Sequence, residues 1–308
     1  MTSARPTTLL ASLSGGPETG VVLKSAIGLA TLFGMEVEAV HVSDEGEATQ
    51  NVGAATRAVG LELHEWPGPI GDRLLEVLKL PQVFGAVMGM RTFISGPRPA
   101  GHMALQVLRG TSKPLVLVPP EAALPQMFTP RRLLVPLDGS PQASRAFLTM
   151  ERLFQEEANV EVVILYALNG LTPRMIDHPY YDLPIWGEDF LRRYCPGENR
   201  SFQWSTGNPV GAVIDVAAEI ESDLIVLSFA GDIEVGHGAV IREVLSRSSV
   251  PVIIVPVINR VMAGVSFAPE GLKKQAVHNE IPRRSLGSGT ESRCRSEVSG
   301  GRNSKPQR

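Results

Sequence analysis

The chain has 308 residues, 43% of them hydrophobic, so it can bury a substantial core and is long enough for two domains of ordinary size. Its formal net charge of −3 argues against a general attraction to nucleic acid or to an anionic membrane, and we expect neither as a partner. The chain has only two cysteines, which excludes a disulfide framework. Its N-terminus lacks an apolar core of signal-peptide length, and no apolar run approaches about 18 residues, so we expect the cytoplasm as its location.

The first half of the chain is predicted to alternate strands and helices. Residues 7–42 contain an apolar strand, a glycine turn with Pro17, an amphipathic helix and a second apolar strand. Residues 68–90 continue with a turn, a helix and a strand, and residues 104–120 close with a helix, a turn and a last strand. The order is typical of strand-helix-strand units that build a parallel sheet.

The second half repeats this order. Its three segments, residues 131–168, 206–229 and 240–257, match those of the first half in sequence, with Pro141 in the place of Pro17. Continuous apolar strands separated by helical patterns indicate a parallel sheet with both faces covered. The sequence therefore predicts a Rossmann-like α/β chain with two doubly wound domains.

The domain boundaries follow from composition. We expect the first domain at 1–120, a linker at 121–130, which has two prolines and little periodicity, and the second domain at 131–258. Residues 259–308 are rich in Ser, Gly and Arg, hold ten Lys and Arg against four Asp and Glu, and are predicted to be disordered. This basic tail either attracts an acidic partner or is a solvated tail without specific function.

These repeated segments resemble the universal stress protein family, in a tandem arrangement of the UspA-like kind. The resemblance covers about residues 8–119 and 132–257 and is carried by VPLDGSPQASRA at 135–146. It is also carried by a closing pattern of Val-Leu, five residues, Pro and a strand that ends in Val-Pro, at 107–119 and 244–256.

The resemblance implies two flavodoxin-like domains of the adenine nucleotide alpha hydrolase-like kind, each with a five-stranded parallel sheet. It also implies a role in the stress response and self-association through the final strands. A tandem chain can make that final-strand pairing within itself, so both a monomer and further dimers remain open.

The first strand of the second half ends in a carboxylate, Asp138. In an open parallel sheet, ligands bind beyond the carboxyl ends of the strands, where the strand order reverses. There Asp138 can accept hydrogen bonds from an adenine amino group or a ribose hydroxyl. Alternatively, Asp138 organises its own turn, with Ser140 capping the next helix and Pro141 at its first position. The two roles do not exclude each other.

Nucleotide-binding members of the resembled family carry Gly-x2-Gly-x9-Gly-Ser/Thr after the fourth strand, a loop whose amides and hydroxyl hold phosphate. In the second half Ser228 stands at the first glycine and Ala239 at the hydroxyl position. The loop from Gly231 to Gly238 is three residues short, and it carries two carboxylates that disfavour phosphate unless Mg²⁺ or Arg242 compensates.

The corresponding loop of the first half departs from the family pattern differently. Gly89 and Gly101 keep nearly the family spacing, but the second glycine and the hydroxyl residue are lost. Ser14 stands where the family has its carboxylate, and Pro97 and Pro99 remove two amide donors from the loop. Neither half is expected to hold a complete nucleotide site.

Two functions remain open on the sequence alone. One is a non-catalytic stress-response or regulatory module with degenerate nucleotide sites that acts through protein partners. The other is a switch that binds ATP or another adenine nucleotide in the second half. Such a site would use Pro136, Leu137, Asp138, Ala167, Gly231, Gly238, Ala239 and Val240.

No residue pattern signals catalysis or a metal site. We find no Ser-His-Asp order and no Cys-His pair at catalytic spacing, and the six histidines lack metal-ligand spacing. Slow nucleotide hydrolysis is an expectation of the family resemblance alone. The segment 172–204 gathers three Tyr, two Trp and two Phe, which either pack a variable helix or form a patch for a partner.

Overall fold

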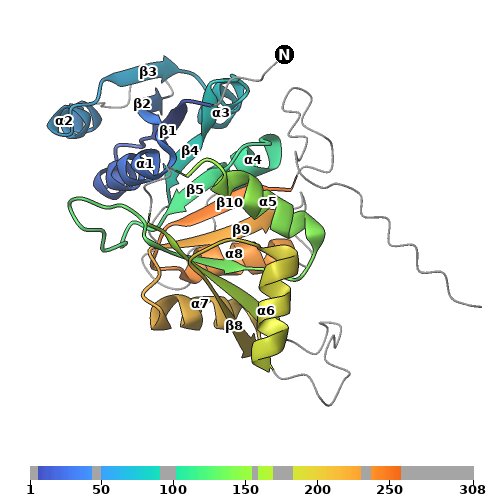
Figure 1. Ribbon diagram of the computed structural model, residues 1–308. Coiled ribbons are helices and arrows are strands. Elements are labelled where there is room, and N and C mark those ends of the chain that lie inside the picture. The colour runs from blue at the N-terminus through green and yellow to red at the C-terminus, as the bar shows by residue number, and fades with distance from the viewer. Residues whose placement is uncertain are drawn as a thin grey trace, which may run out of the picture. The chain divides into compact units, whose positions relative to one another are not determined.

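In the part of the chain that the structure describes, ten strands form one sheet in the order β3-β2-β1-β4-β5-β10-β9-β6-β7-β8 (Figure 1). The structure is a computed structural model, and it describes residues 6–43, 50–90, 102–154, 159–168, 183–229 and 237–257. The predicted tail at 259–308 lies outside these residues.

Each half of the chain contributes five strands and the helices between them. The elements of the first half are β1 (Thr8–Ser12), α1 (Thr19–Phe33), β2 (Glu36–Ser43), α2 (Gln50–Ala58), β3 (Leu63–Pro67), α3 (Ile70–Leu78), β4 (Val83–Gly89), α4 (His102–Gly110) and β5 (Leu115–Val118). Those of the second half are β6 (Arg132–Pro136), α5 (Pro141–Glu151), β7 (Glu161–Leu168), α6 (Leu183–Tyr194), β8 (Arg200–Thr206), α7 (Pro209–Glu219), β9 (Leu224–Phe229), α8 (His237–Arg247) and β10 (Val252–Pro256).

The prediction of a doubly wound α/β fold with five parallel strands in each half is confirmed. Within each half all neighbouring strands are parallel, and the first strand lies between the second and the fourth. The two sets of five are not separate sheets, however. Strands β5 and β10 pair antiparallel, with Leu117 opposite Val252 and Leu115 opposite Ile254. Both strands are apolar and buried, so the pairing satisfies two edges that would otherwise be exposed.

The helices cover the two faces of the sheet in two layers. Side chains of α1, α2, α5 and α6 share one apolar cluster with the strands, and side chains of α3, α4, α7 and α8 share the other. The segment predicted as a linker, 121–130, is packed as well, because Phe128 is buried against Gly28 of α1. The domain boundaries themselves stay a prediction.

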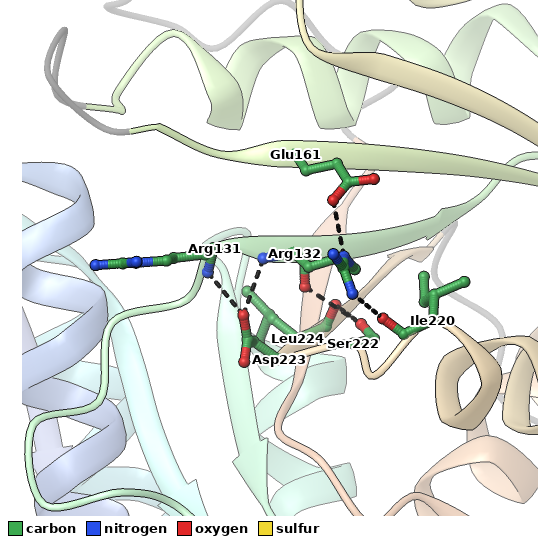
Figure 2. A network of polar contacts seen from close by, with 7 residues as sticks. All are labelled: Arg131, Arg132, Glu161, Ile220, Ser222, Asp223 and Leu224. Carbon is green, nitrogen blue, oxygen red and sulfur yellow. Dashed lines mark hydrogen bonds and ion pairs between the residues drawn. The ribbon is translucent and has the colours of Figure 1, made fainter.

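A polar network fixes the amino end of β6, the central strand of the second half (Figure 2). The Asp223 carboxylate accepts hydrogen bonds from the backbone N–H groups of Arg131, at 2.8 Å, and Arg132, at 2.9 Å. Nε of Arg132 lies 2.8 Å from Oε2 of Glu161 on β7, and its guanidinium also donates to the Ile220 carbonyl. These contacts hold β6 against β7 and against the start of β9. They therefore determine which residues lie at the carboxyl end of β6.

A buried arginine holds α5, α6 and β8 together. The guanidinium of Arg200, whose side chain is only 5% exposed, pairs with Glu151 at the end of α5 and donates to Sγ of Cys195, 2.9 Å away. Burial raises the pKa of Glu151 despite the attraction to Arg200, and it raises the pKa of the Cys195 thiol to about 11. The ring of Phe147 lies 5.9 Å below the guanidinium carbon.

Most of the aromatic segment 172–204 packs rather than faces solvent, where the structure describes it. Trp186 and Phe190 of α6 are buried, and their rings lie 5.1 and 5.2 Å from that of Phe202 on β8. Tyr166 on β7 joins the same cluster. Trp204 differs from the others because it is 44% exposed.

We predict that Glu151→Ala lowers the free energy of unfolding by about 2 kcal/mol, because it leaves the buried Arg200 guanidinium without its carboxylate. The loss is smaller than the roughly 3–5 kcal/mol of a fully buried pair because Glu151 keeps partial solvent access. Urea denaturation measures it. Glu76→Ala is the control, since its exposed pair with Arg73 is expected to contribute little. Equal effects of the two substitutions would contradict the prediction.

We also predict that Cys195 resists alkylation in the folded protein at pH 8. Its pKa of about 11 keeps the group as a thiol at this pH, and burial excludes the reagent, whereas alkylation requires an accessible thiolate. Mass spectrometry of the peptide that contains Cys195, after iodoacetamide treatment with and without urea, measures the protection. Labelling of the native protein as fast as that of glutathione would show the thiol to be accessible.

Candidate functional site

The strand order reverses at one point in each half of the sheet. In the second half β7 lies on one side of β6 and β9 on the other, and in the first half β2 and β4 flank β1 in the same way. Ligands of open parallel sheets bind beyond the carboxyl ends of the strands at such points. We call these places the second crevice, at β6 and β9, and the first crevice, at β1 and β4.

In the second crevice the chain leaves β6 through Pro136 and Leu137 and turns at Asp138. Leu137 is buried and its N–H donates to the Leu165 carbonyl over 2.9 Å, so it continues the path of the strand. Asp138 is exposed, and Gly139 adopts φ +77°, a conformation that side chains disfavour. The predicted residues at this strand end therefore lie at the crevice.

Asp138 takes part in the turn that starts α5. Its Oδ1 accepts a hydrogen bond from the Ser140 N–H at 2.8 Å, and Oγ of Ser140 accepts one from the Ala143 N–H at 3.2 Å. Pro141 is the first residue of the helix. The turn and capping role considered for these residues is thus present, and the ligand role of Asp138 stays a prediction.

An aromatic wall stands beside Asp138. Tyr166 on β7 is buried, and a Cβ atom on Gly139 would lie within 3.7 Å of its ring and within 3.5 Å of Phe190. Burial raises the pKa of the Tyr166 phenol, and the charge of Asp138 raises it further, so the phenol remains neutral. The next predicted site residue, Ala167, follows Tyr166 on β7 and is half-buried.

The remaining predicted residues belong to the start of α8. Gly238 is buried in the first turn of this helix, and Ala239 and Val240 are half-buried. Gly231 lies outside the described residues, as do Asp232 and Glu234.

The two crevices differ in how far their central strands stay paired. The ladder between β6 and β9 ends at Leu134 and Ile225, two residues before β6 ends. The ladder between β1 and β4 continues to Ser12 and Met88, the last residue of β1 and its partner. The central strands therefore part at the second crevice and remain together at the first.

A buried carboxylate that the sequence reading overlooked occupies the first crevice. Glu18 precedes α1 and is only 8% exposed, and it accepts a hydrogen bond from Oγ of Ser14. Oγ of Ser14 in turn accepts one from the Gly16 N–H at 3.2 Å. The residue aligned with Asp138 is therefore a serine that holds a glutamate four positions later.

Gly89, predicted as the first glycine of a phosphate loop, instead makes room for Glu18. A Cβ atom at Gly89 would lie 2.3 Å from Cγ of Glu18 and 3.2 Å from Cγ2 of Val22. Glutamate just before a predicted helix, after Gly-Gly-Pro, was the available signal for this contact.

His41 is a second overlooked group near the first crevice. It is buried on β2, and its Nδ1–H donates to the Leu13 carbonyl at 2.7 Å. Its Nε2 has no hydrogen-bond partner among the residues that the structure describes. Leu13 and Leu137 make equivalent backbone bonds to Val40 and Leu165, so His41 occupies the position of Tyr166. One half thus places an imidazole where the other places a phenol.

The described residues offer hydrogen-bonding and charged groups at these crevices. Among them, no three His, Cys, Asp or Glu side chains gather in a way that could hold a metal ion. Within the same part of the chain, no helix has the length and apolar character needed to cross a membrane.

Solved structures share this architecture across both halves. A universal stress protein from Archaeoglobus fulgidus DSM 4304 is 16% identical and aligns over 83% of this chain and 100% of its own, with a TM-score of 0.56. A protein of unknown function from Pseudomonas aeruginosa PAO1 is 12% identical and aligns over 82% and 93%, with a TM-score of 0.57. At these identities the likeness shows the fold.

The second half of the chain also resembles a known family in sequence. No curated protein matches the chain. The model of the Universal stress protein family matches residues 129–256, the part that holds β6 to β10 and the second crevice. The second half is therefore similar in sequence to the universal stress protein family, and both halves share the fold of a solved universal stress protein.

Proposed function

We propose that the chain is a non-catalytic stress-response module that acts through protein contacts, and that its first crevice holds no nucleotide. The observation that carries this proposal is the buried Glu18 side chain, whose carboxylate accepts a hydrogen bond from Ser14 and whose Cγ lies against Gly89. It lies where a bound nucleotide would need space and positive potential.

The charge of Glu18 works against phosphate in two ways. First, it lies at the N-terminus of α1, so it already supplies the negative charge that this helix end favours. Second, a phosphate brought near a buried carboxylate meets like-charge repulsion that solvent screens poorly. In the first half, the protein's own side chain thus takes the place of an anionic ligand.

The second crevice supports a different candidate, a switch that binds ATP or another adenine nucleotide. The β6–β9 ladder ends early beside Asp138, and α8 starts at the same end of the sheet. Unpaired backbone groups and a helix N-terminus are the means by which this architecture holds nucleotides. Against it stand the engagement of Asp138 in the α5 turn and the shortened loop before Gly238.

Titration calorimetry and thermal unfolding of the full chain with ATP, ADP and AMP, with and without Mg²⁺, separate the two candidates. We expect no heat of binding and no shift in Tm. A ligand at 100 times its Kd would add about 2.7 kcal/mol of stability, which is readily detected. Micromolar binding that Asp138→Ala abolishes would replace the first candidate with the nucleotide switch.

The role of Gly89 gives a test of the closed first crevice. We predict that Gly89→Ala destabilises the protein by about 1–3 kcal/mol, because the added methyl overlaps Glu18 in a packed site. Gly20→Ala is the matched control: a Cβ atom there meets nothing within 4 Å, and alanine favours the helix. Urea midpoints compare the two. A neutral Gly89→Ala would mean that Glu18 leaves the crevice easily, contrary to the proposal.

A further inference from the structure

Among the described strands, β8 (Arg200–Thr206) is the last of the sheet and pairs only with β7. No other described strand lies along its outer side, which we call the β8 edge. Unpaired N–H and C=O groups on such an edge can pair with a further strand, and proteins usually prevent this with charge, proline or short length.

The two edges of the sheet differ in this protection. Strand β3, at the opposite edge, has five residues, exposes His64 and Glu65, and ends in Pro67. Strand β8 has seven residues, and from Ser201 to Thr206 it carries neither charge nor proline. Charge, proline and short length therefore protect the β3 edge against pairing with a further strand, and the β8 edge lacks this protection.

The single charge of β8 does not protect its edge. Arg200 turns its guanidinium inward to Glu151 and Cys195, and its side chain is only 5% exposed. A charge that is buried and paired adds little repulsion to a strand approaching the edge.

Exposed apolar side chains lie on β8 and on the helix that contacts it. Trp204 on β8 is 44% exposed, and Ile185 in the first turn of the neighbouring α6 is 57% exposed. Figure 1 shows α6 beside β8 at this end of the sheet. The inward aromatic residue of the strand, Phe202, packs against Trp186, so β8 is held firmly for pairing.

We propose that the β8 edge binds the β8 edge of a second copy of this chain, antiparallel and centred on Gln203. The strand is complementary to itself in this register, because Phe202 faces Trp204 and Ser201 faces Ser205 of the other copy. Aromatic pairs stabilise adjacent strands, and no like charges meet. A two-fold axis makes both copies use the same surface.

The balanced charge of helix α6 also fits a second copy of this chain as the partner. Its exposed Glu188 and Asp189 are balanced by Arg192 and Arg193, so two copies of α6 brought side by side do not repel each other by net charge. The same kind of antiparallel pairing occurs within the chain, where β5 and β10 join the two halves. Those final strands already have neighbours on both sides, whereas β8 has a neighbour on one side only among the strands that the structure describes.

Sedimentation equilibrium of the full 33.1 kDa chain between about 1 and 100 µM tests the proposal. We expect a concentration-dependent dimer, and we expect Trp204→Lys to weaken association at least tenfold by adding a charge to the edge. His64→Lys, the same change on the already charged β3 edge, should associate as the wild type does. Ser201→Lys is a second edge variant, and circular dichroism checks that each variant folds.

Disulfide formation tests the register. Residue 203 of each copy lies opposite its equivalent, with Cα atoms about 4.5–5.5 Å apart, a distance that a disulfide spans. Gln203→Cys, with Cys294 replaced by Ser, should form a covalent dimer on mild oxidation, and Ser205→Cys in the same background should not. A monomeric wild type at 100 µM, or a Trp204→Lys variant that associates like the wild type, would overturn the proposal.

Discussion

The antiparallel pairing of β5 with β10 is the constraint on which the rest of the structure depends. Both strands are apolar on both faces, so either would expose a hydrophobic edge if its half stood alone. Their pairing joins two sets of five strands into one sheet and lets helices from both halves share the same two apolar layers. As a result, the edges left among the described strands are β3 and β8, and the reversal points of the strand order become the two crevices.

Local patterns were sufficient to predict the fold class and most of the elements, because a strand such as β9 or a helix such as α1 is encoded in consecutive residues. Strands β3 and β8 lie in segments that no local pattern assigned, and the fifth strand of each half was implied only by the family resemblance. The joined sheet was not predictable in the same way. The residues that pair, Leu115 to Leu117 and Val252 to Ile254, are far apart in sequence and have the same composition as any buried strand. Whether such a strand pairs within its chain or with another chain depends on geometry that a single sequence does not contain.

The candidate site also contains one residue that local patterns predicted and others that depend on contacts between distant parts of the chain. Asp138 was predictable because the end of an apolar strand fixes where the following residue emerges. Glu18 was missed because position-by-position comparison puts Ser14 opposite Asp138, whereas a glutamate four residues later reaches back to the same place through its longer side chain. His41 was missed because its significance lies in one hydrogen bond to the Leu13 carbonyl, a contact made only after β1 and β2 lie side by side.

The two halves thus share one architecture but differ in their crevices and in their sheet edges. The first half fills its crevice with a carboxylate, keeps its central strands paired and guards its edge with charge and proline. The second half separates its central strands and leaves a long uncharged edge beside exposed Trp204 and Ile185. Since a fold by itself does not define a function, surfaces such as these decide what a chain binds. The first half therefore fills its crevice and protects its edge with its own residues, whereas the second half leaves backbone and apolar groups available for contacts with other molecules.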